Sequence, residues 1–216
     1  MQKLNKETIN LTFWDEGKKY SKNLNFVVPN MAAFVRDVTE YGNIGAIVRR
    51  ALKLSPLSLI KMAWWNKFNV LKLLKKDFAT GLGVLVQMEI LQILKYRPQM
   101  IALTDQVTDL AMALQNMAII KGYLRTICNV GLDSSLVTNN LLDTATTLGR
   151  LNIKNCRVIT PFNSYGYEMN PSQARVEAMI KLMDPSLIYA IVPEDNAKED
   201  KYLTSFGIQK KVVKWF

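Results

Sequence analysis

The 216-residue chain contains no histidine. This absence excludes Ser-His-Asp and Cys-His nucleophile activation and removes the commonest zinc ligand. General acid–base chemistry would fall to Asp, Glu, Lys, Tyr or Cys. Cysteine is scarce as well: Cys128 and Cys156 give neither a disulfide framework nor a metal-ligand spacing. We expect both thiols to be buried in a protein of the reducing cytoplasm, and we predict no metal site.

Long hydrophobic runs are also absent. The best candidate, residues 84–94, is interrupted by Gln87, Glu89 and Gln92 and is too short to span a bilayer. The first 22 residues lack the apolar core of a secretory signal. A cytoplasmic location is therefore predicted.

Positive charge is concentrated in the first half of the chain. Residues 1–98 carry 16 Lys and Arg against 7 Asp and Glu, whereas residues 99–216 carry 12 against 11. We expect one domain over residues 1–216, in which a helix-rich basic portion packs on the regular β/α units of the second half.

Strand-like and helix-like runs alternate after Pro98, which is typical of a parallel sheet covered by helices. Because such strands are buried on both faces, they lack polar alternation. Residues before 22 look loosely structured. A helical block from Met31 to Arg97 stands where a regular barrel would have its first β/α units. The fold class is therefore predicted as α/β, a (β/α) barrel-like fold that is shortened or irregular, with an open sheet as the alternative. Strands are expected within residues 24–28, 99–105, 135–140, 156–163, 186–193 and 208–216.

The helical block divides at glycine, serine and proline. Gly42 and Gly45 are candidate breaks in the first helix, and Ser55 and Pro56 suit the N-cap and first position of the second. A later helical stretch, 106–131, is expected to be two helices meeting near Asn116 or Gly122.

The second half resembles a family of uncharacterised, largely archaeal and bacterial, TIM-barrel-like proteins. The stretches that carry the resemblance are "ALTDQVTDLAMALQN" (102–116), "SLVTNNL" (135–141), "VITPFNSYGYEMNPSQA" (158–174) and "LIYAIVP" (187–193). Their order is similar to the later strands of aldo-keto reductase barrels, where strand ends line a nicotinamide site. The Tyr-Lys-Asp-His set of those enzymes cannot be complete in a chain without His. The resemblance makes nicotinamide the first cofactor to test, and the residues themselves assign none.

Polar residues stand at the expected carboxyl ends of the strands, where ligands bind in parallel α/β folds. We predict a small polar or phosphorylated ligand there, in a protein that could be an enzyme, with Asp105 as general base or as ligand of a cation. The alternative is that these residues cap helices and form turns. The predicted ligand-binding residues are Gln106, Thr138, Asn139, Asn140, Thr160, Asn163, Ser164 and Tyr165.

The segment "FNSYGYEMNPSQA" (162–174) has two parts. Asn170 as N-cap, Pro171 in the first turn and Gln173 three residues after Asn170 suit a helix start. "NSYGY" is not explained in this way, and it is predicted to be either a structural loop or a loop that covers a ligand.

The stretch from Tyr41 to Lys76 carries eight Lys and Arg and no acid. We predict that Lys61, Trp65, Lys72 and Lys76 contact a partner, which could be a membrane surface or nucleic acid contacted through residues 47–76, or another protein. A homo-oligomer is a further alternative. The opposite face of the same helix, which includes Leu57, Ile60 and Trp64, is expected to pack on the barrel.

Overall fold

The computed structural model describes residues 6–66 and 78–213; the side chains of residues 43, 65–66 and 78–80 lie outside this description. Its strands form one all-parallel sheet in the order β1-β8-β7-β6-β5-β4-β3-β2. The α/β class and the six predicted strands are confirmed. The strands are β1 (Glu7–Thr8), β2 (Leu11–Phe13), β3 (Asn25–Val28), β4 (Met100–Leu103), β5 (Ser134–Val137), β6 (Arg157–Pro161), β7 (Ile188–Val192) and β8 (Lys210–Val213).

The two edge strands of this sheet are consecutive in the chain. Only Ile9 and Asn10 separate Thr8 at the end of β1 from Leu11 at the start of β2. Neighbouring strands lie about 4.8 Å apart, so a flat eight-stranded sheet would hold its edges roughly 34 Å apart. Three chain steps span at most about 11 Å. The sheet must therefore curl until its two edges lie within this distance of each other at the connection. Because β1 pairs with β8 and β2 with β3, rather than with each other, the result is an irregular barrel that stays open.

Both faces of the curled sheet are buried, as the strand composition predicts. Alternate side chains point inward and form a core of their own, while those between them pack against the helices. The inside of the curled sheet is thus filled with side chains. The inner core consists of Ile9, Leu11, Val27, Met100, Ala102, Val137, Ile159, Tyr189, Ile191 and Val212.

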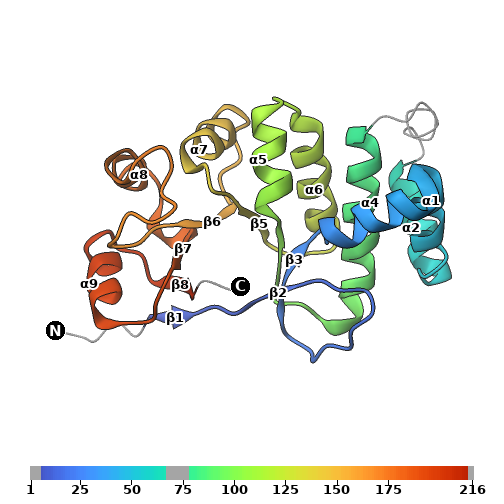
Figure 1. Cartoon of the computed structure of the whole chain (residues 1–216), viewed down its shortest axis with the longest axis horizontal. Coiled ribbons are helices and arrows are strands. Elements are labelled where there is room, and N and C mark those ends of the chain that lie inside the picture. Colours follow the sequence, from blue (N-terminus) through green and yellow to red (C-terminus); the bar gives the residue numbers. More distant parts are fainter. Residues whose placement is uncertain (1–5, 67–77, 214–216) are drawn as a thin grey trace.

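Helices lie in an arc outside the strands, with α1 and α2 at the end of the molecule beyond α4 (Figure 1). The predicted break in α1 is confirmed at Gly42, whose φ of 71° favours glycine. The predicted break near Asn116 is also confirmed, because Asn116 caps α6. The helices are α1 (Met31–Ala51), α2 (Pro56–Asn66), α4 (Phe78–Ile93), α5 (Asp105–Ala113), α6 (Met117–Asn129), α7 (Leu141–Arg150), α8 (Gln173–Ile180) and α9 (Ala197–Ser205).

From Lys6 onward the opening segment is ordered, so the expectation of a loose start is wrong for the residues described. Trp14 is buried and packs against the rings of Tyr20, Phe26 and Tyr96. The backbone N–H of Trp14 also donates to the carbonyl of Val27. The segment was not recognisable as strand because β1 and β2 are only two and three residues long.

The predicted orientation of α2 is wrong as well. Its start is as expected, since the backbone N–H of Ser58 donates to the hydroxyl of Ser55. However, α2 packs on α4 through Leu59 and Met62, in a small core that is separate from the barrel. The predicted packing face, with Leu57 and Ile60, therefore points to solvent.

Two smaller expectations have clear outcomes. Cys156 is buried, and its burial raises the thiol pKa to about 11, whereas Cys128 near the end of α6 is exposed, contrary to prediction. Within residues 6–66 and 78–213, none of the helices is both long and apolar enough to cross a membrane.

Candidate functional site

Two carboxylates and one asparagine lie together at the carboxyl ends of β4 and β5. The side-chain amide of Asn139 donates to Asp105 over 2.9 Å, and its backbone N–H donates to Asp109 over 2.9 Å. The hydroxyl of Thr104 donates to the other carboxylate oxygen of Asp105. The sequence predicted Asp105 and Asn139 as neighbours at the sheet edge, and the structure brings them into direct contact.

Asp109 was missed by the sequence prediction although it completes this network. Its carboxylate accepts a 2.5 Å hydrogen bond from Thr138, whose hydroxyl also lies 3.0 Å from that of Thr144. Burial raises the pKa of the Asp109 carboxyl; the hydrogen bonds from Thr138 and Asn139 oppose this, and the charge of Asp105 adds to it. The available signal was spacing, since a residue four positions after Asp105 lies on the same face of α5.

Asn140 joins this network to the start of α7. Its backbone N–H donates to the hydroxyl of Thr138, while its side-chain oxygen accepts from the backbone N–H of Asp143 and caps the helix. Its side-chain amide donates to the carboxylate of Asp143 over 2.6 Å. The alternative interpretation of helix capping thus holds for Asn140, and the same residue also borders a cavity.

A cavity of about 360 Å³ lies between the start of α7 and the segment that leads into α8, two helices that contact each other. One basic side chain in its wall is available for a ligand: Arg175 is exposed and forms no hydrogen bond or ion pair with any described residue. The wall therefore offers a guanidinium, a carboxylate and two amides. The cavity is lined by Asn140, Leu142, Asp143, Asn170, Pro171 and Arg175.

Asn163 organises the loop after β6. Its side-chain oxygen accepts from the backbone N–H groups of Tyr165 and Tyr167, and its amide donates to the carbonyl of Tyr167. Gly166 has a φ of 70°, and a Cβ there would lie 2.7 Å from the side-chain oxygen of Gln173. The buried side chain of Asn163 thus stabilises the loop from within, through hydrogen bonds to the backbone of Tyr165 and Tyr167.

Ser164 anchors the same loop to α9. Its backbone N–H and its hydroxyl both donate to the buried carboxylate of Glu199, the latter over 2.5 Å. On the exposed side, the ammonium group of Lys198 lies 3.9 Å from the ring centre of Tyr165. Glu199 was not predicted, because an acid in the run "EDKY" reads as a solvated surface residue.

Replacing Glu199 by Ala tests this anchor. We expect the free energy of unfolding in urea to fall by about 1–3 kcal/mol, because two donors of Ser164 lose their buried acceptor. Glu194→Ala removes an exposed carboxylate that accepts, among the described residues, from Asn196 alone. This variant should change stability by less than about 0.5 kcal/mol. Equal effects of the two variants would show that the Glu199 anchor contributes nothing.

The remaining predicted residues are dispersed. Gln106 is exposed on α5, whereas Thr160 lies within β6 and is buried. Asn170 does not cap α8, contrary to prediction: the helix begins at Gln173 with Ser172 as N-cap. The structure thus forms one cluster from Asp105, Thr138, Asn139 and Asn140, and a separate one from Asn163, Ser164 and Tyr165. Their roles in ligand binding stay predictions.

Among the described residues, no group of three or more Cys, Asp or Glu side chains could hold a metal ion. Of the predicted partner contacts, Lys61 is exposed on α2. The side chain of Trp65 and the whole of Lys72 and Lys76 lie outside the described residues.

Comparisons with protein-family models, with curated proteins and with solved structures give no match. The predicted resemblance to TIM-barrel-like proteins therefore holds for the fold alone, through the curled parallel sheet and its surrounding helices.

Proposed function

We propose that this protein binds a small polar ligand with an anionic group, such as a phosphate, in the cavity between α7 and α8. The observation that carries the proposal is the position of this 360 Å³ cavity. It lies at the carboxyl ends of β5 and β6, which is the ligand-binding edge of parallel α/β folds. Arg175 would contact the anionic group, and Asn140 and Asn170 would contact the polar remainder.

The chemistry of the wall narrows the ligand class. A guanidinium forms paired hydrogen bonds with phosphate or carboxylate oxygens. Asp143 lies across the same cavity and would repel a ligand that is only anionic. The mixture favours a ligand that also carries hydroxyl or amine donors, such as a sugar phosphate or an amino acid derivative.

Catalysis by Asp105 is a separate prediction. Both oxygens of Asp105 accept hydrogen bonds, from Thr104 and Asn139. From Asp105 the hydrogen bonds run through Asn139 and Asp109 to Thr138. The hydroxyl of Thr138 accepts from the backbone N–H of Asn140, which lines the cavity. The predicted layout of an aldo-keto reductase barrel adds nicotinamide dinucleotides to the phosphorylated compounds to be tested.

Thermal denaturation with inorganic phosphate, sugar phosphates, amino acids and nicotinamide dinucleotides tests the proposal. A ligand at about 100 times its Kd stabilises the folded state by about 2.7 kcal/mol. Arg175→Gln should weaken binding by roughly tenfold or more, because a charged hydrogen bond is lost. Arg125→Gln is the matched control, since Arg125 is exposed on α6 and unpaired among the described residues. Absence of any stabilising compound, or an equal response of the Arg175→Gln variant, would contradict the proposal.

A further inference from the structure

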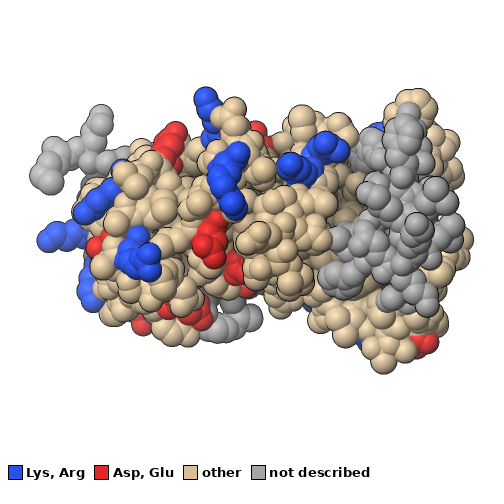
Figure 2. Space-filling view, turned by 90° about the horizontal axis from the view of Figure 1, so that it is seen from above, with Lys and Arg blue, Asp and Glu red and all other residues tan. Residues whose placement is uncertain are grey.

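Two side chains of opposite charge line the cavity between α7 and α8 without pairing with each other. Asp143 lies in the first turn of α7 and Arg175 in the first turn of α8, and the other lining residues are uncharged. Neither of the two forms an ion pair with any described residue. Figure 2 shows basic and acidic side chains together over this part of the surface. Two opposite charges that face one cavity and stay apart leave room for a ligand between them.

The carboxylate of Asp143 is oriented by one of its two oxygens. Its Oδ2 accepts from the side-chain amide of Asn140 over 2.6 Å. Its Oδ1 accepts no hydrogen bond from the part of the chain that the structure describes. An ammonium group can bind such an oxygen through a charge-assisted hydrogen bond. A ligand hydroxyl could also donate to it, but the negative charge would then stay uncompensated where the ligand displaces water.

The starts of the two helices favour opposite charges. Asn140 caps α7, because its side chain accepts from the backbone N–H of Asp143. Ser172, the N-cap of α8, forms no side-chain capping hydrogen bond. The first turn of α8 also carries Arg175, at a place where helices favour an acid. An anion there would accept from the first-turn N–H groups and pair with the guanidinium. The anionic end of a ligand therefore belongs at α8 and a cationic end at α7.

We propose that the ligand carries an ammonium group as well as its anionic group, and that Asp143 binds the ammonium while Arg175 binds the anion. This inference rests on the function proposed above and narrows its ligand class to amino acids and phosphorylated amines. A ligand with a single charge would leave the opposite charge of the wall partly desolvated and unpaired, which costs binding free energy.

Calorimetric titration of the full-length protein with phosphoethanolamine and with ethyl phosphate tests the proposal, because the two compounds differ by one amine. The parent should bind phosphoethanolamine roughly tenfold more tightly, since it gains a charged hydrogen bond. Asp143→Asn should remove this advantage and leave ethyl phosphate bound equally or more tightly, because repulsion of the anion is lost. The new amide keeps an oxygen that can accept from Asn140, so the helix start is retained. Arg175→Gln should weaken the binding of both compounds.

Asp184→Asn is the matched control. Asp184 is exposed and caps the short 3-10 helix Pro185–Leu187, outside the cavity wall, so its replacement should leave the binding of both compounds unchanged. The proposal is overturned if the parent binds the two compounds equally, if it binds neither, or if Asp143→Asn weakens both alike. With equal binding, the anion site of the proposed function still stands when Arg175→Gln weakens the binding of ethyl phosphate. If Arg175→Gln binds both compounds as the parent does, the proposed function fails as well.

Discussion

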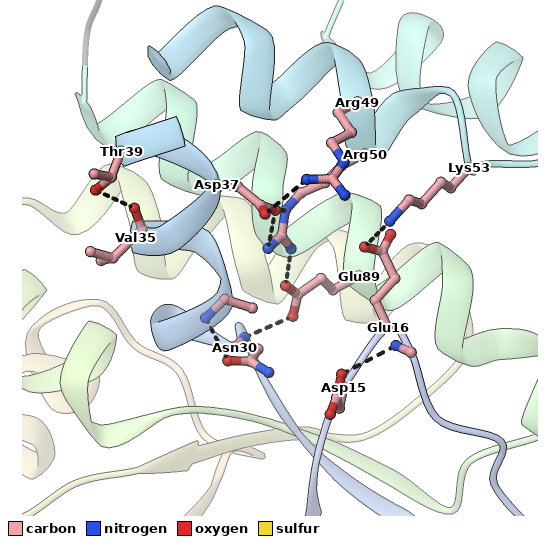
Figure 3. A network of polar contacts seen from close by, with 12 residues as sticks. Asp15, Glu16, Asn30, Val35, Asp37, Thr39, Arg49, Arg50, Lys53 and Glu89 are labelled. Carbon is pink, nitrogen blue, oxygen red and sulfur yellow. Dashed lines mark hydrogen bonds and ion pairs between the residues drawn. The ribbon is translucent and has the colours of Figure 1, made fainter. Parts of the chain in front are cut away.

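An Arg50→Ala variant is expected to lose about 3–5 kcal/mol of unfolding free energy at about pH 8, the largest effect that we predict for a single substitution. The guanidinium of Arg50 is buried together with two carboxylates (Figure 3). It donates to Asp37 over 3.0 Å and to Glu89 over 2.7 Å. Without it, Glu89 would lose its counterion, and Asp37 would keep only the more exposed Arg49.

This network joins three elements around the kink of α1. Asp37 lies before the kink at Gly42 and Arg50 lies after it, so their ion pair fixes the two halves of the helix relative to each other. Glu89, on α4, attaches this ion pair to that helix through its bond with Arg50. Glu89 also accepts from the backbone N–H of Asn30, which follows β3. Loss of the guanidinium is therefore expected to loosen the whole attachment of α1.

Arg49→Ala is the control for this experiment. The side chain of Arg49 is 45% exposed and lies 3.5 Å from Asp37. An exposed pair of this kind contributes about 0–1 kcal/mol. Urea unfolding of both variants separates the two cases, and a loss in Arg50→Ala no larger than in Arg49→Ala would refute the structural role of the buried pair.

A Glu89→Gln variant should remove a large part of the pH dependence of stability. Burial raises the pKa of Glu89 from 4.5 to about 7, and the hydrogen bond from Asn30 and the charge of Arg50 oppose this rise without cancelling it. Between these two values the folded state binds more protons than the unfolded chain. The free energy of unfolding therefore falls as pH rises through this range.

The contribution of Glu89 to the free energy of unfolding is fully present below the pKa of this residue in the unfolded chain. It is lost as the pH rises through the pKa of Glu89 in the folded state. A difference of this size corresponds to about 3 kcal/mol. We expect Glu89→Gln to match the parent near pH 4.5 and to become relatively more stable toward pH 8. Urea titrations across this range measure the difference between the two proteins, and parallel pH profiles would exclude Glu89 as the titrating group.

The sheet was predictable from the sequence because its strands carry the signal themselves. Residues 157–161 and 188–192 are apolar runs bounded by polar residues and proline, as doubly buried strands require. By contrast, β1 and β2 are defined by their pairing with β8 and β3, which no local pattern records. The curvature of the sheet follows from that pairing, which is why an open sheet stayed an alternative to the predicted barrel-like fold at the level of sequence.

The candidate site was predictable only in part, for a related reason. Chain order places Asp105 and Asn139 at neighbouring strand ends, so their contact follows from the topology. Glu199 and Arg175 gain their positions from tertiary packing on other elements. The helical wheel likewise identified an apolar stripe on α2 but could not show that α4 is covered by Leu59 and Met62 instead.

Residues 7–13 form two successive strands that pair with different partners, β1 with β8 and β2 with β3, and this has a consequence for biosynthesis. The first strand pairs with β8 near the other end of the sequence, and Lys6, just before β1, donates to the carbonyl of Ile208, 202 residues away. Because the ribosome synthesises a chain from its N-terminus, β1 cannot pair until β8 has been made. Until then both outer strands of the growing sheet keep unsatisfied backbone groups, which makes the nascent chain vulnerable to pairing with other chains. Such long-range closure also predicts slow folding for a protein of this size.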